Sequence, residues 1–490
     1  MADTDTTAQT WYETTRVASE ARPRLTFDLD IDVCVIGGGL AGLTVAREVA
    51  RRGWSVAVLE ANHIASAASG RNTGFVMPGF SEELDGMVER VGLDHTKQLW
   101  ALSVMGVDYM RRAIAETGMA GVYPVDGWLN VSKTDNDDNV RNQIERMRWI
   151  GANVEMWPTE RVRAALPSQR YFNAVHYPNA FHIHPLNYAI GLANAAASEG
   201  ARIFEESAAI EIDAAGVRKR ITTQSGRVRA SHVVLAGNVH LGMLMPRLSA
   251  TLMPITTYVM VSEPIGPHLH EVIRYRGAVT DGKRTDNHYR IVGGDRLQWA
   301  GRMTVRPRDA SRFARGLLAD IRGNFAELGD IRIANLWSGT FGRSVHHMPQ
   351  IGAIEPGVWV ASGFGGHGLN TTAMAGELIA RGIVDNDDTW RLFAPYELVW
   401  AGGIIGRAAV QGVYWGAKPL DSIGQGLARY REGARRRKAE RVAVRKSRMP
   451  AEQAPPAPEP EAPGPKHFGK RPRGGSGPSG PRDGSAQGEG

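Results

Sequence analysis

One short segment near the N-terminus constrains the fold of this chain more than any other. An apolar run at residues 31–36 is followed by residues 40–52, whose apolar side chains recur on one face at helical spacing, and then by a second apolar run at 56–59. The turn between the first run and the helix carries the pattern G-x-G-x-x-G, formed by Gly37, Gly39 and Gly42. This order of strand, glycine-rich turn, helix and strand predicts one βαβ unit that binds a dinucleotide.

Each glycine of the pattern has its own physical role. Gly37 allows a tight turn, Gly39 lets a pyrophosphate approach the backbone, and Gly42 lets the helix pack closely on the strand. Leu40 and Ala41 belong to the first helical turn, where the partial positive charge of the helix N-terminus favours phosphate. These five residues are therefore predicted to bind the cofactor.

An acidic residue, Glu60, ends the second strand and is followed by Ala61. Its carboxylate can accept hydrogen bonds from ribose hydroxyls, and it would repel a 2′-phosphate, which disfavours NADP. Glu60 and Ala61 are assigned to the same site. Because FAD and NAD share this pattern, the unit alone does not decide between them.

Two further loops favour FAD. The loop at 66–74 follows the second strand and offers small residues and backbone donors for a flat ring and its phosphates. Its predicted ligand-binding residues are Ser69, Gly70, Arg71, Asn72 and Thr73. The loop at 363–371 opens a helix whose positive end can stabilise a reduced flavin, which is anionic near its pyrimidine edge. Its predicted cofactor-binding residues are Gly365, Gly366, His367, Gly368 and Leu369.

These segments resemble the D-amino-acid-oxidase superfamily of FAD enzymes, and within it the γ-glutamylputrescine oxidase type. The resemblance spans roughly residues 10–425, and outside the two loops it is carried by Val35 to Gly42, by His184 to Asn187, by the Trp11–Tyr12 pair and by Gly301–Arg302. It implies an α/β (α+β) fold, with a Rossmann-like FAD-binding domain and a second substrate domain built on an antiparallel sheet. By position it also places three further residues near FAD, namely Ala209 at the adenine, Gly237 near the pyrophosphate, and Gly339.

The resemblance suggests a division of the chain into five parts. We expect an N-terminal arm at 1–28, an FAD-binding domain from 29–90, 150–250 and 335–390, a substrate domain from 91–149 and 251–334, a helical segment at 391–427, and a tail at 428–490. Short strands are expected at 202–212, 251–262 and 287–301, a hairpin at 218–223 and 227–235, and helices at 187–199, 308–327 and 371–383.

The resemblance also implies a chemistry. Members of this superfamily oxidise a C–N bond by moving hydride from carbon to flavin; the imine hydrolyses, and oxygen usually takes the electrons to give hydrogen peroxide. The expected substrate is an amine or amino acid, including γ-glutamylputrescine-like compounds. We expect non-covalent FAD, because Cys34 lies inside the first strand and His63 is poorly placed for attachment.

Four residues are candidates for contact with the substrate: Arg343, His367, Tyr258 and His184. Arg343 could bind a carboxylate bidentately, and Tyr258, Tyr289 and His184 could line the pocket; a structural role is open for each. At two places the sequence departs from the pattern of this superfamily, and these differences leave the substrate preference open. Thr73 stands where relatives tend to carry glycine, and His346 and His347 stand where relatives often place an acidic residue.

Composition leaves other possibilities open. The net charge is +7, but residues 428–448 alone carry +8, so the rest of the chain is nearly neutral. From Pro450 onward the chain holds ten prolines and nine glycines, which predicts disorder. The single cysteine excludes an intrachain disulfide and fits a cytoplasmic protein without a cysteine-based metal site. Arg407 and Gln411 interrupt the apolar stretch 398–415, which favours a buried or amphipathic helix over a membrane span.

Two other functions are compatible with the sequence. The first is a flavin dehydrogenase that passes electrons to a quinone or a carrier protein. The second is a flavin-containing binding protein that uses the basic run at 435–448 for nucleic acid. This run lacks interleaved aromatic residues for base stacking, which favours a solvated tail without a nucleic-acid partner.

Overall fold

The computed structural model describes residues 9–135, 137–281 and 287–414, together with residues 430, 434 and 437. By contacts the chain divides into a unit of residues 1–433 and a unit of residues 434–490. The sheets, the helices and the candidate site all belong to the first unit. The predicted disordered tail lies outside the described residues, apart from the three isolated positions.

The described strands form two sheets. The first has eight strands in the order β16 (Gln350–Glu355), β17 (Val358–Ser362), β10 (Arg227–Leu235), β1 (Leu29–Ile36), β2 (Val56–Leu59) and β7 (Arg202–Phe204), with β9 (Lys219–Thr222) and β8 (Glu211–Asp213) added beside β10. The strands from β17 to β7 run parallel, and β10 and β9 form the predicted hairpin. Ile36 pairs with Leu59 and Leu235, so these three strands end at one edge of the sheet.

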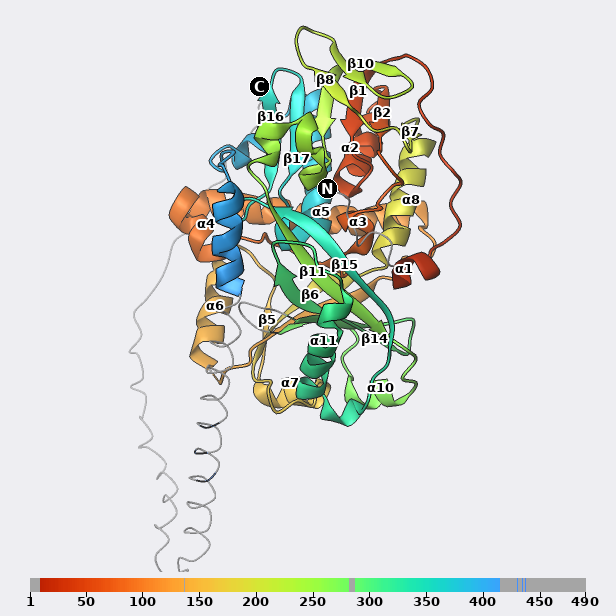
Figure 1. The fold of residues 1–490 in the computed structure, drawn as a ribbon. Coiled ribbons are helices and arrows are strands. Elements are labelled where there is room, and N and C mark those ends of the chain that lie inside the picture. The colour runs from red at the N-terminus through yellow and green to blue at the C-terminus, as the bar shows by residue number, and fades with distance from the viewer. Residues whose placement is uncertain are drawn as a thin grey trace, which may run out of the picture. The chain divides into compact units, whose positions relative to one another are not determined.

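Four long helices build the main core against this sheet. They are α2 (Leu40–Arg51), α5 (Leu93–Thr117), α8 (Pro185–Ser198) and α12 (Gly368–Val384). Buried apolar side chains from all four belong to one cluster with those of β1 and β2. Figure 1 shows α2 beside α8, in the upper half of the drawing, next to the strands of the first sheet. The packing of α12 on α2 brings residues 40 and 368 to the same side of the core.

The second sheet has nine described strands and is mainly antiparallel. Their order is β15 (Ile333–Arg343), β11 (Met253–Ser262), β14 (Arg296–Thr304), β13 (Asn287–Val292), β12 (Ala278–Asp281), β4 (Val125–Val131), β6 (Ala174–His182) and β3 (Phe75–Val76), with β5 (Glu155–Trp157) paired to β6. Among the described strands of this sheet, only β12 and β4 pair in parallel. A Rossmann-like sheet with a separate antiparallel sheet confirms the predicted fold class.

Further helices complete the unit. They are α1 (Trp11–Thr14), α3 (Ala68–Arg71), α4 (Leu84–Val91), α6 (Asp137–Trp149), α7 (Thr159–Ala165), α9 (Pro246–Ser249), α10 (His268–Val272) and α11 (Ser311–Asn324), the 3₁₀ helices η1 (Asn238–Leu244), η2 (Ala326–Leu328), η3 (Gly365–His367) and η4 (Asp388–Phe393), and a helix at 403–414. Among the described residues, no helix is both long enough and apolar enough to cross a membrane.

The structure differs from the sequence expectations at three places. The strand expected at 287–301 is a hairpin of β13 and β14, because Gly293 and Gly294 turn the chain with φ of 61° and 86°. The strand expected at 202–212 breaks after β7, where Glu206 and Ser207 bond to the backbone of the loop after β2. The boundary expected at residue 150 divides the second sheet, because β5 and β6 pair with one another and β6 with β4.

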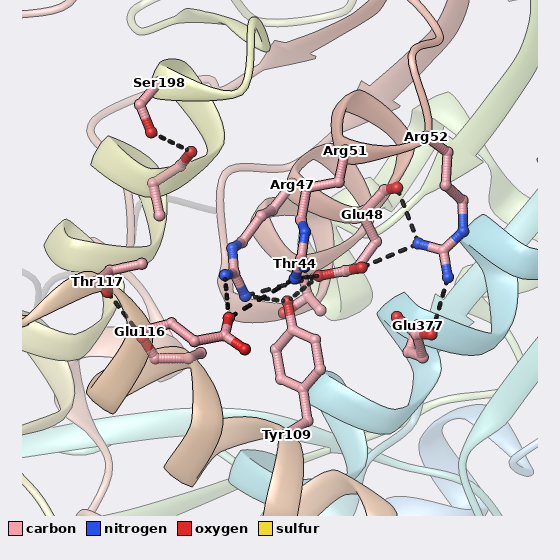
Figure 2. Close-up of polar contacts among 12 residues, drawn as sticks. Thr44, Arg47, Glu48, Arg51, Arg52, Tyr109, Glu116, Thr117, Ser198 and Glu377 are labelled. Atoms are coloured by element: carbon pink, nitrogen blue, oxygen red, sulfur yellow. Dashed lines mark hydrogen bonds and ion pairs between the residues drawn. The ribbon is translucent and has the colours of Figure 1, made fainter.

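An ionic network around the buried Glu48 ties α2 to α12 and α5 (Figure 2). Arg52, the residue after α2, contacts Glu48 at 2.9 Å, Glu377 at 2.9 Å and Asp385 at 3.0 Å. Tyr109 of α5 donates to the other oxygen of Glu48 at 2.7 Å. Burial acts to raise the pKa of Glu48, but the hydrogen bonds that its carboxylate accepts, among them those from Tyr109 and Arg52, bring it below its ordinary value. Glu48 is therefore a buried carboxylate whose charge depends on these donors.

We expect Arg52→Met to destabilise the protein by about 2–4 kcal/mol, because it leaves the Glu48 carboxylate buried without its main cation. Urea unfolding followed by circular dichroism measures the change. Arg51→Met is the matched control: its side chain is 41% exposed and lies 3.6 Å from Glu48, so a change within about 0.5 kcal/mol is expected. Equal losses in the two variants would contradict this role of Arg52.

Candidate functional site

A cavity of about 970 Å³ lies where the first sheet meets the second. Its lining comes from the loops after β1, β2, β10 and β17 and from strands β15, β11, β14, β13 and β3. The predicted cofactor-binding residues that line it are Gly37, Gly39, Leu40, Ala41, Glu60, Ala61, Ser69, Arg71, Asn72, Thr73, Ala209, Gly237, Gly339, Gly365, Gly366, His367, Gly368 and Leu369. The structure thus gathers segments more than 300 residues apart around one space.

The turn between β1 and α2 has no room for side chains. Gly37 has φ of 113°, and a Cβ there would lie 2.9 Å from the backbone of Ala236. A Cβ on Gly39 would lie 2.8 Å from Ser69 Oγ, which accepts a hydrogen bond from the Leu40 N–H at 3.0 Å. Bare backbone and the N-terminus of α2 therefore face the cavity, which is the surface that a pyrophosphate requires.

Gly42 and Gly70 do not line the cavity, but they shape its wall from behind. A Cβ on Gly42 would lie 2.0 Å from the carbonyl oxygen of Gly37, and one on Gly70 would lie 2.4 Å from that of Ala65. Both positions are closed to any larger residue without movement of the backbone. Gly42 thus lets α2 approach β1, as the sequence pattern predicts.

The Glu60 carboxylate is held at the end of β2 by two backbone donors. Its Oε2 accepts from the Gly38 N–H at 2.7 Å, and its Oε1 accepts from the Asn62 N–H at 2.9 Å. The Ser207 N–H bonds to the Glu60 carbonyl at 2.8 Å, which brings Ala209 to the same end of the cavity. A fixed carboxylate with free lone pairs suits ribose hydroxyls and repels a phosphate in their place.

The loop at 66–74 is fastened to β15 of the second sheet and to the start of α2. The Asn72 amide donates to the carbonyls three and four residues earlier, at 2.8 Å and 3.1 Å, and so orders the loop itself. Arg71 Nε donates to the Ser338 carbonyl at 2.9 Å, and Trp337 Nε1 donates to the Arg71 carbonyl at 3.0 Å. These bonds to β15 place the loop between the two sheets, where Thr73 also lines the cavity.

The far part of the cavity is mainly apolar. The face of the second sheet contributes Thr257, Met303, Phe341, Phe75 and, just after β3, Met77. Arg343 at the end of β15 also lines it, and its guanidinium lies 6.0 Å from the ring of Tyr414. An arginine at the rim of an apolar space can hold a carboxylate while the rest of a ligand stays out of water.

His288 on β13 lines this part of the cavity, and sequence reasoning missed it. Trp128 Nε1 donates to Thr280 Oγ1 at 2.9 Å, and Thr280 Oγ1 lies 3.0 Å from His288 Nδ1. Burial lowers the pKa of His288 to about 4, so the ring is neutral at pH 7 and carries one N–H. His288 therefore offers one N–H donor.

His367, in η3, is the second imidazole of the cavity. Burial, and then repulsion from His288, lower the pKa of His367 to about 4. Its Nδ1 is buried and has no hydrogen-bond partner among the described residues. An unpaired buried polar atom in the wall of a cavity is a contact that a ligand can complete.

Tyr258 and His184 lie outside the cavity, so the structure does not place them against a ligand there. Tyr258 bonds through its hydroxyl to Thr304 and stacks on Phe313 at 3.9 Å between ring centres. His184 caps α8, with Nδ1 accepting from the backbone at 3.1 Å, and its pKa falls to about 3 through burial and the charge of Arg290. Both side chains stabilise the fold of their surroundings.

Three histidines and the pocket tyrosine named from sequence also lie elsewhere. His346 bonds to groups of its own turn and to the Glu397 carbonyl, and His347 lies 3.8 Å from Glu82. Tyr289 stacks on Trp299 at 4.5 Å within the second sheet, and the exposed ring of His63 pairs with Glu205. None of these four lines the cavity.

A longer set of lining residues was not predicted from sequence. It comprises Ile36, Leu59, Asn62, 65–68, Ser81, Ala208, Ile210, Ala236, 238–241, Met243, Leu244, Thr340, Phe364 and Thr372, besides the apolar group and His288 above. The sequence contained one indication that residues 238–241, which follow Gly237, would line the cavity. Residues 233–237 resemble the end of a parallel strand, and the loops after such strands meet at one edge of a sheet.

Comparisons with known proteins agree with this geometry. The family model "DAO: FAD dependent oxidoreductase" matches residues 32–381. The chain belongs to this family. It is 31% identical to γ-glutamylputrescine oxidoreductase of Escherichia coli over 372 residues, which cover 74% of this chain and 86% of that protein. The match confirms the predicted class of enzyme and its cofactor, FAD.

Solved structures of the DAO fold superimpose on most of the chain. Glycine oxidase from Geobacillus kaustophilus gives a TM-score of 0.63 at 21% identity and covers 76% of this chain and 99% of its own. L-proline dehydrogenase from P. horikoshii also gives 0.63, at 20% identity, covering 75% of this chain and 98% of its own. The two-sheet architecture is thus that of the DAO flavoenzymes.

We expect Gly42→Ala to lower the FAD content of the purified protein about tenfold or more, since the new methyl group would lie 2.0 Å from the Gly37 oxygen and push α2 from β1. The ratio of flavin to protein absorbance measures this, and circular dichroism checks that the variant is folded. Gly412→Ala is the control, because no atom lies within 4 Å of an added Cβ there. A folded Gly42→Ala protein with full FAD content would show that this close approach is unnecessary.

Proposed function

We propose that this DAO-family enzyme oxidises the C–N bond of an amine or amino acid with non-covalent FAD and passes the electrons to oxygen. The observation that carries the proposal is the cavity that joins the Gly37 turn, Glu60, both loops and an apolar far end. The relatives named above are, by their names, an oxidoreductase of γ-glutamylputrescine, a glycine oxidase and an L-proline dehydrogenase. All three compounds carry a CH–N group.

The residues of the cavity fit the parts of FAD in order. We assign the pyrophosphate to the backbone of residues 37–41 and Gly237, the ribose to Glu60, and the adenine to the backbone of Ala209. The loop at 69–73, Gly339 of β15 and residues 365–369 before and at the start of α12 would hold the flavin ring. When bound, FAD accepts a hydride from the carbon next to the substrate nitrogen.

Non-covalent attachment is supported by the position of the two nucleophiles considered. Cys34 is buried in β1, and burial raises the pKa of its thiol to about 12. The ring of His63 is exposed and paired with Glu205. Neither side chain lines the cavity. A thiol that stays protonated and cannot reach the ligand forms no bond to it.

The far end of the cavity would orient the substrate and exclude water. Arg343 can bind a carboxylate, and the neutral imidazole of His288 can form a hydrogen bond with a second polar group of the substrate. His367 is neutral at pH 7, so it adds no positive charge that would repel an ammonium group. Apolar walls from Phe75, Met77 and Phe341 keep the reacting carbon out of water, which hydride transfer requires.

This function is tested by anaerobic reduction. We expect at least one member of a panel of primary and secondary amines, N-methyl amino acids and γ-glutamyl polyamines to bleach the flavin absorbance of the purified holoenzyme. On admission of air, the flavin should reoxidise with one hydrogen peroxide for each turnover. Bleaching without peroxide would favour a dehydrogenase that uses a quinone or carrier protein, and no bleaching by any C–N donor would overturn the proposal.

Arg343 is predicted to select for a carboxylate. We expect Arg343→Ala to raise the KM of carboxylate-bearing substrates about 10- to 100-fold, the cost of a lost charged hydrogen bond, and to leave amines without a carboxylate nearly unchanged. Arg343→Lys should give an intermediate loss, because lysine keeps the charge without the bidentate geometry. Arg312→Ala, at an exposed position on α11, is the control. Equal effects on both substrate classes would refute a carboxylate clamp.

A further inference from the structure

A buried arginine lies next to the site, on the strand that also carries His288. Arg290 belongs to β13 and is 3% exposed. Its Nη1 donates to the Ile183 carbonyl at 2.6 Å and lies 2.8 Å from Nδ1 of His182. Its Nη2 donates to the Tyr12 hydroxyl at 3.0 Å. These contacts hold the guanidinium in a fixed position inside the protein.

The groups around Arg290 leave its positive charge without a counterion. Among the residues that the structure describes, no carboxylate forms an ion pair with it. Burial and the charge of Arg290 lower the pKa of His182 to about 3, so this ring is neutral at pH 7. Burial raises the pKa of the Tyr12 hydroxyl, which is therefore neutral as well. Arginine stays protonated in proteins, and such a buried charge destabilises the fold unless an anion compensates it.

Arg290 lies directly behind one part of the cavity wall. Thr73 and Phe75 line the cavity, whereas Gly74 between them does not. A Cβ on Gly74 would lie 2.6 Å from Nη2 of Arg290, so the guanidinium packs against the backbone of this loop. Gln298 lies 3.4 Å from the same Nη2 through its Oε1, and it donates from Nε2 to the Thr73 carbonyl at 2.9 Å. The charge is thus next to the loop that would hold the flavin ring.

We propose that Arg290 supplies a positive charge that stabilises the reduced, anionic flavin. Transfer of a hydride to a neutral flavin ring leaves one negative charge on it, and a fixed cation nearby favours that state over the oxidised one. The N-terminus of α12 acts in the same direction, but a helix end carries only about half a unit charge. Arg290 does not line the cavity, so it acts through space as a positioning residue.

This inference rests on the proposed function, because it uses the assignment of the flavin ring to the loop at 69–73. It adds the residue that sets how easily the flavin is reduced. A purely structural role is the alternative, since Arg290 also joins the N-terminal arm, through Tyr12, to the second sheet. The two roles differ in what they require: the electrostatic role needs the charge, and the structural role needs the hydrogen bonds.

The test is the affinity of the oxidised holoenzyme for sulfite. Sulfite adds to flavin N5 without any substrate, and the adduct carries a negative charge like that of the reduced ring. The loss of visible flavin absorbance during a titration gives the Kd. We expect Arg290→Met to raise this Kd about tenfold or more, because a unit charge about 10 Å away has such an effect at an effective dielectric constant of about 20. Arg290→Lys keeps the charge and should stay within about threefold of the wild type.

The midpoint potential of the bound flavin reports the same difference by a second route. A tenfold change corresponds to about 30 mV for a two-electron couple, so Arg290→Met should lower the potential by about that amount. Reductive titration against a reference dye measures it. This measurement decides the matter if the wild-type holoenzyme does not bind sulfite.

A second variant neutralises the charge and keeps the guanidinium, so it serves if Arg290→Met does not retain FAD. Gln298→Glu places a carboxylate beside Nη2 of Arg290 and should also raise the sulfite Kd about tenfold. Gln298→Leu is its matched control, because it loses the same bond to Thr73 and adds no charge. Tyr12→Phe removes a hydrogen bond from Arg290 and leaves its charge. Both controls should stay within about twofold of the wild type.

Unchanged sulfite affinity and potential in the FAD-loaded neutralised variants would overturn the inference. Equal losses in Gln298→Glu, Gln298→Leu and Tyr12→Phe would also overturn it, in favour of the structural role. Failure of the proposed function is seen separately: no C–N donor would then bleach the wild-type flavin, whereas the sulfite titration, which needs no substrate, would still measure the effect of Arg290.

Discussion

The site depends on one constraint, the parallel pairing of β1 with β2 and β10. In that register Ile36 lies opposite both Leu59 and Leu235, so the three strands end together. The Gly37 turn, Glu60 and the loop after Gly237 are therefore neighbours although they are far apart in the chain. A slip of one residue in either pairing would separate the backbone donors of the turn from the carboxylate that they orient.

A second constraint is the contact between α2 and α12. The two helices approach so closely that a Cβ on Gly376 would lie 2.4 Å from the side chain of Thr44. Their first residues, Leu40 and Gly368, both line the cavity, so two helix N-termini face the same space. The ion pairs of Arg52 with Glu48 and Glu377 fasten the helices at the other end, which keeps both termini directed at the cavity.

The second sheet supplies most of the side chains at the far end of the cavity. Its face closes the cavity with Phe341, Met303 and His288, from three strands that come together only after β13 and β14 have turned back on one another. The hydrogen-bond chain from Trp128 through Thr280 orients the ring of His288, and it crosses from β4 to β12 to β13. The cofactor end of the cavity is thus built largely of backbone, and the substrate end of side chains.

The amino-acid sequence alone was enough for the parts whose chemistry is local. The Gly37 turn, Gly42 and Glu60 could be placed because a strand, a tight turn and a helix within 30 residues specify their own geometry. The loops at 66–74 and 363–371 could be assigned for the same reason, with the family resemblance. The positions of His288, Tyr258 and His184 required the folded chain, because whether a side chain faces a cavity or a core depends on the register of distant strands. The break in the strand after β7 and the hairpin at Gly293 likewise required the folded chain. The first depends on hydrogen bonds to the loop after β2, and the second on the pairing of β13 with β14.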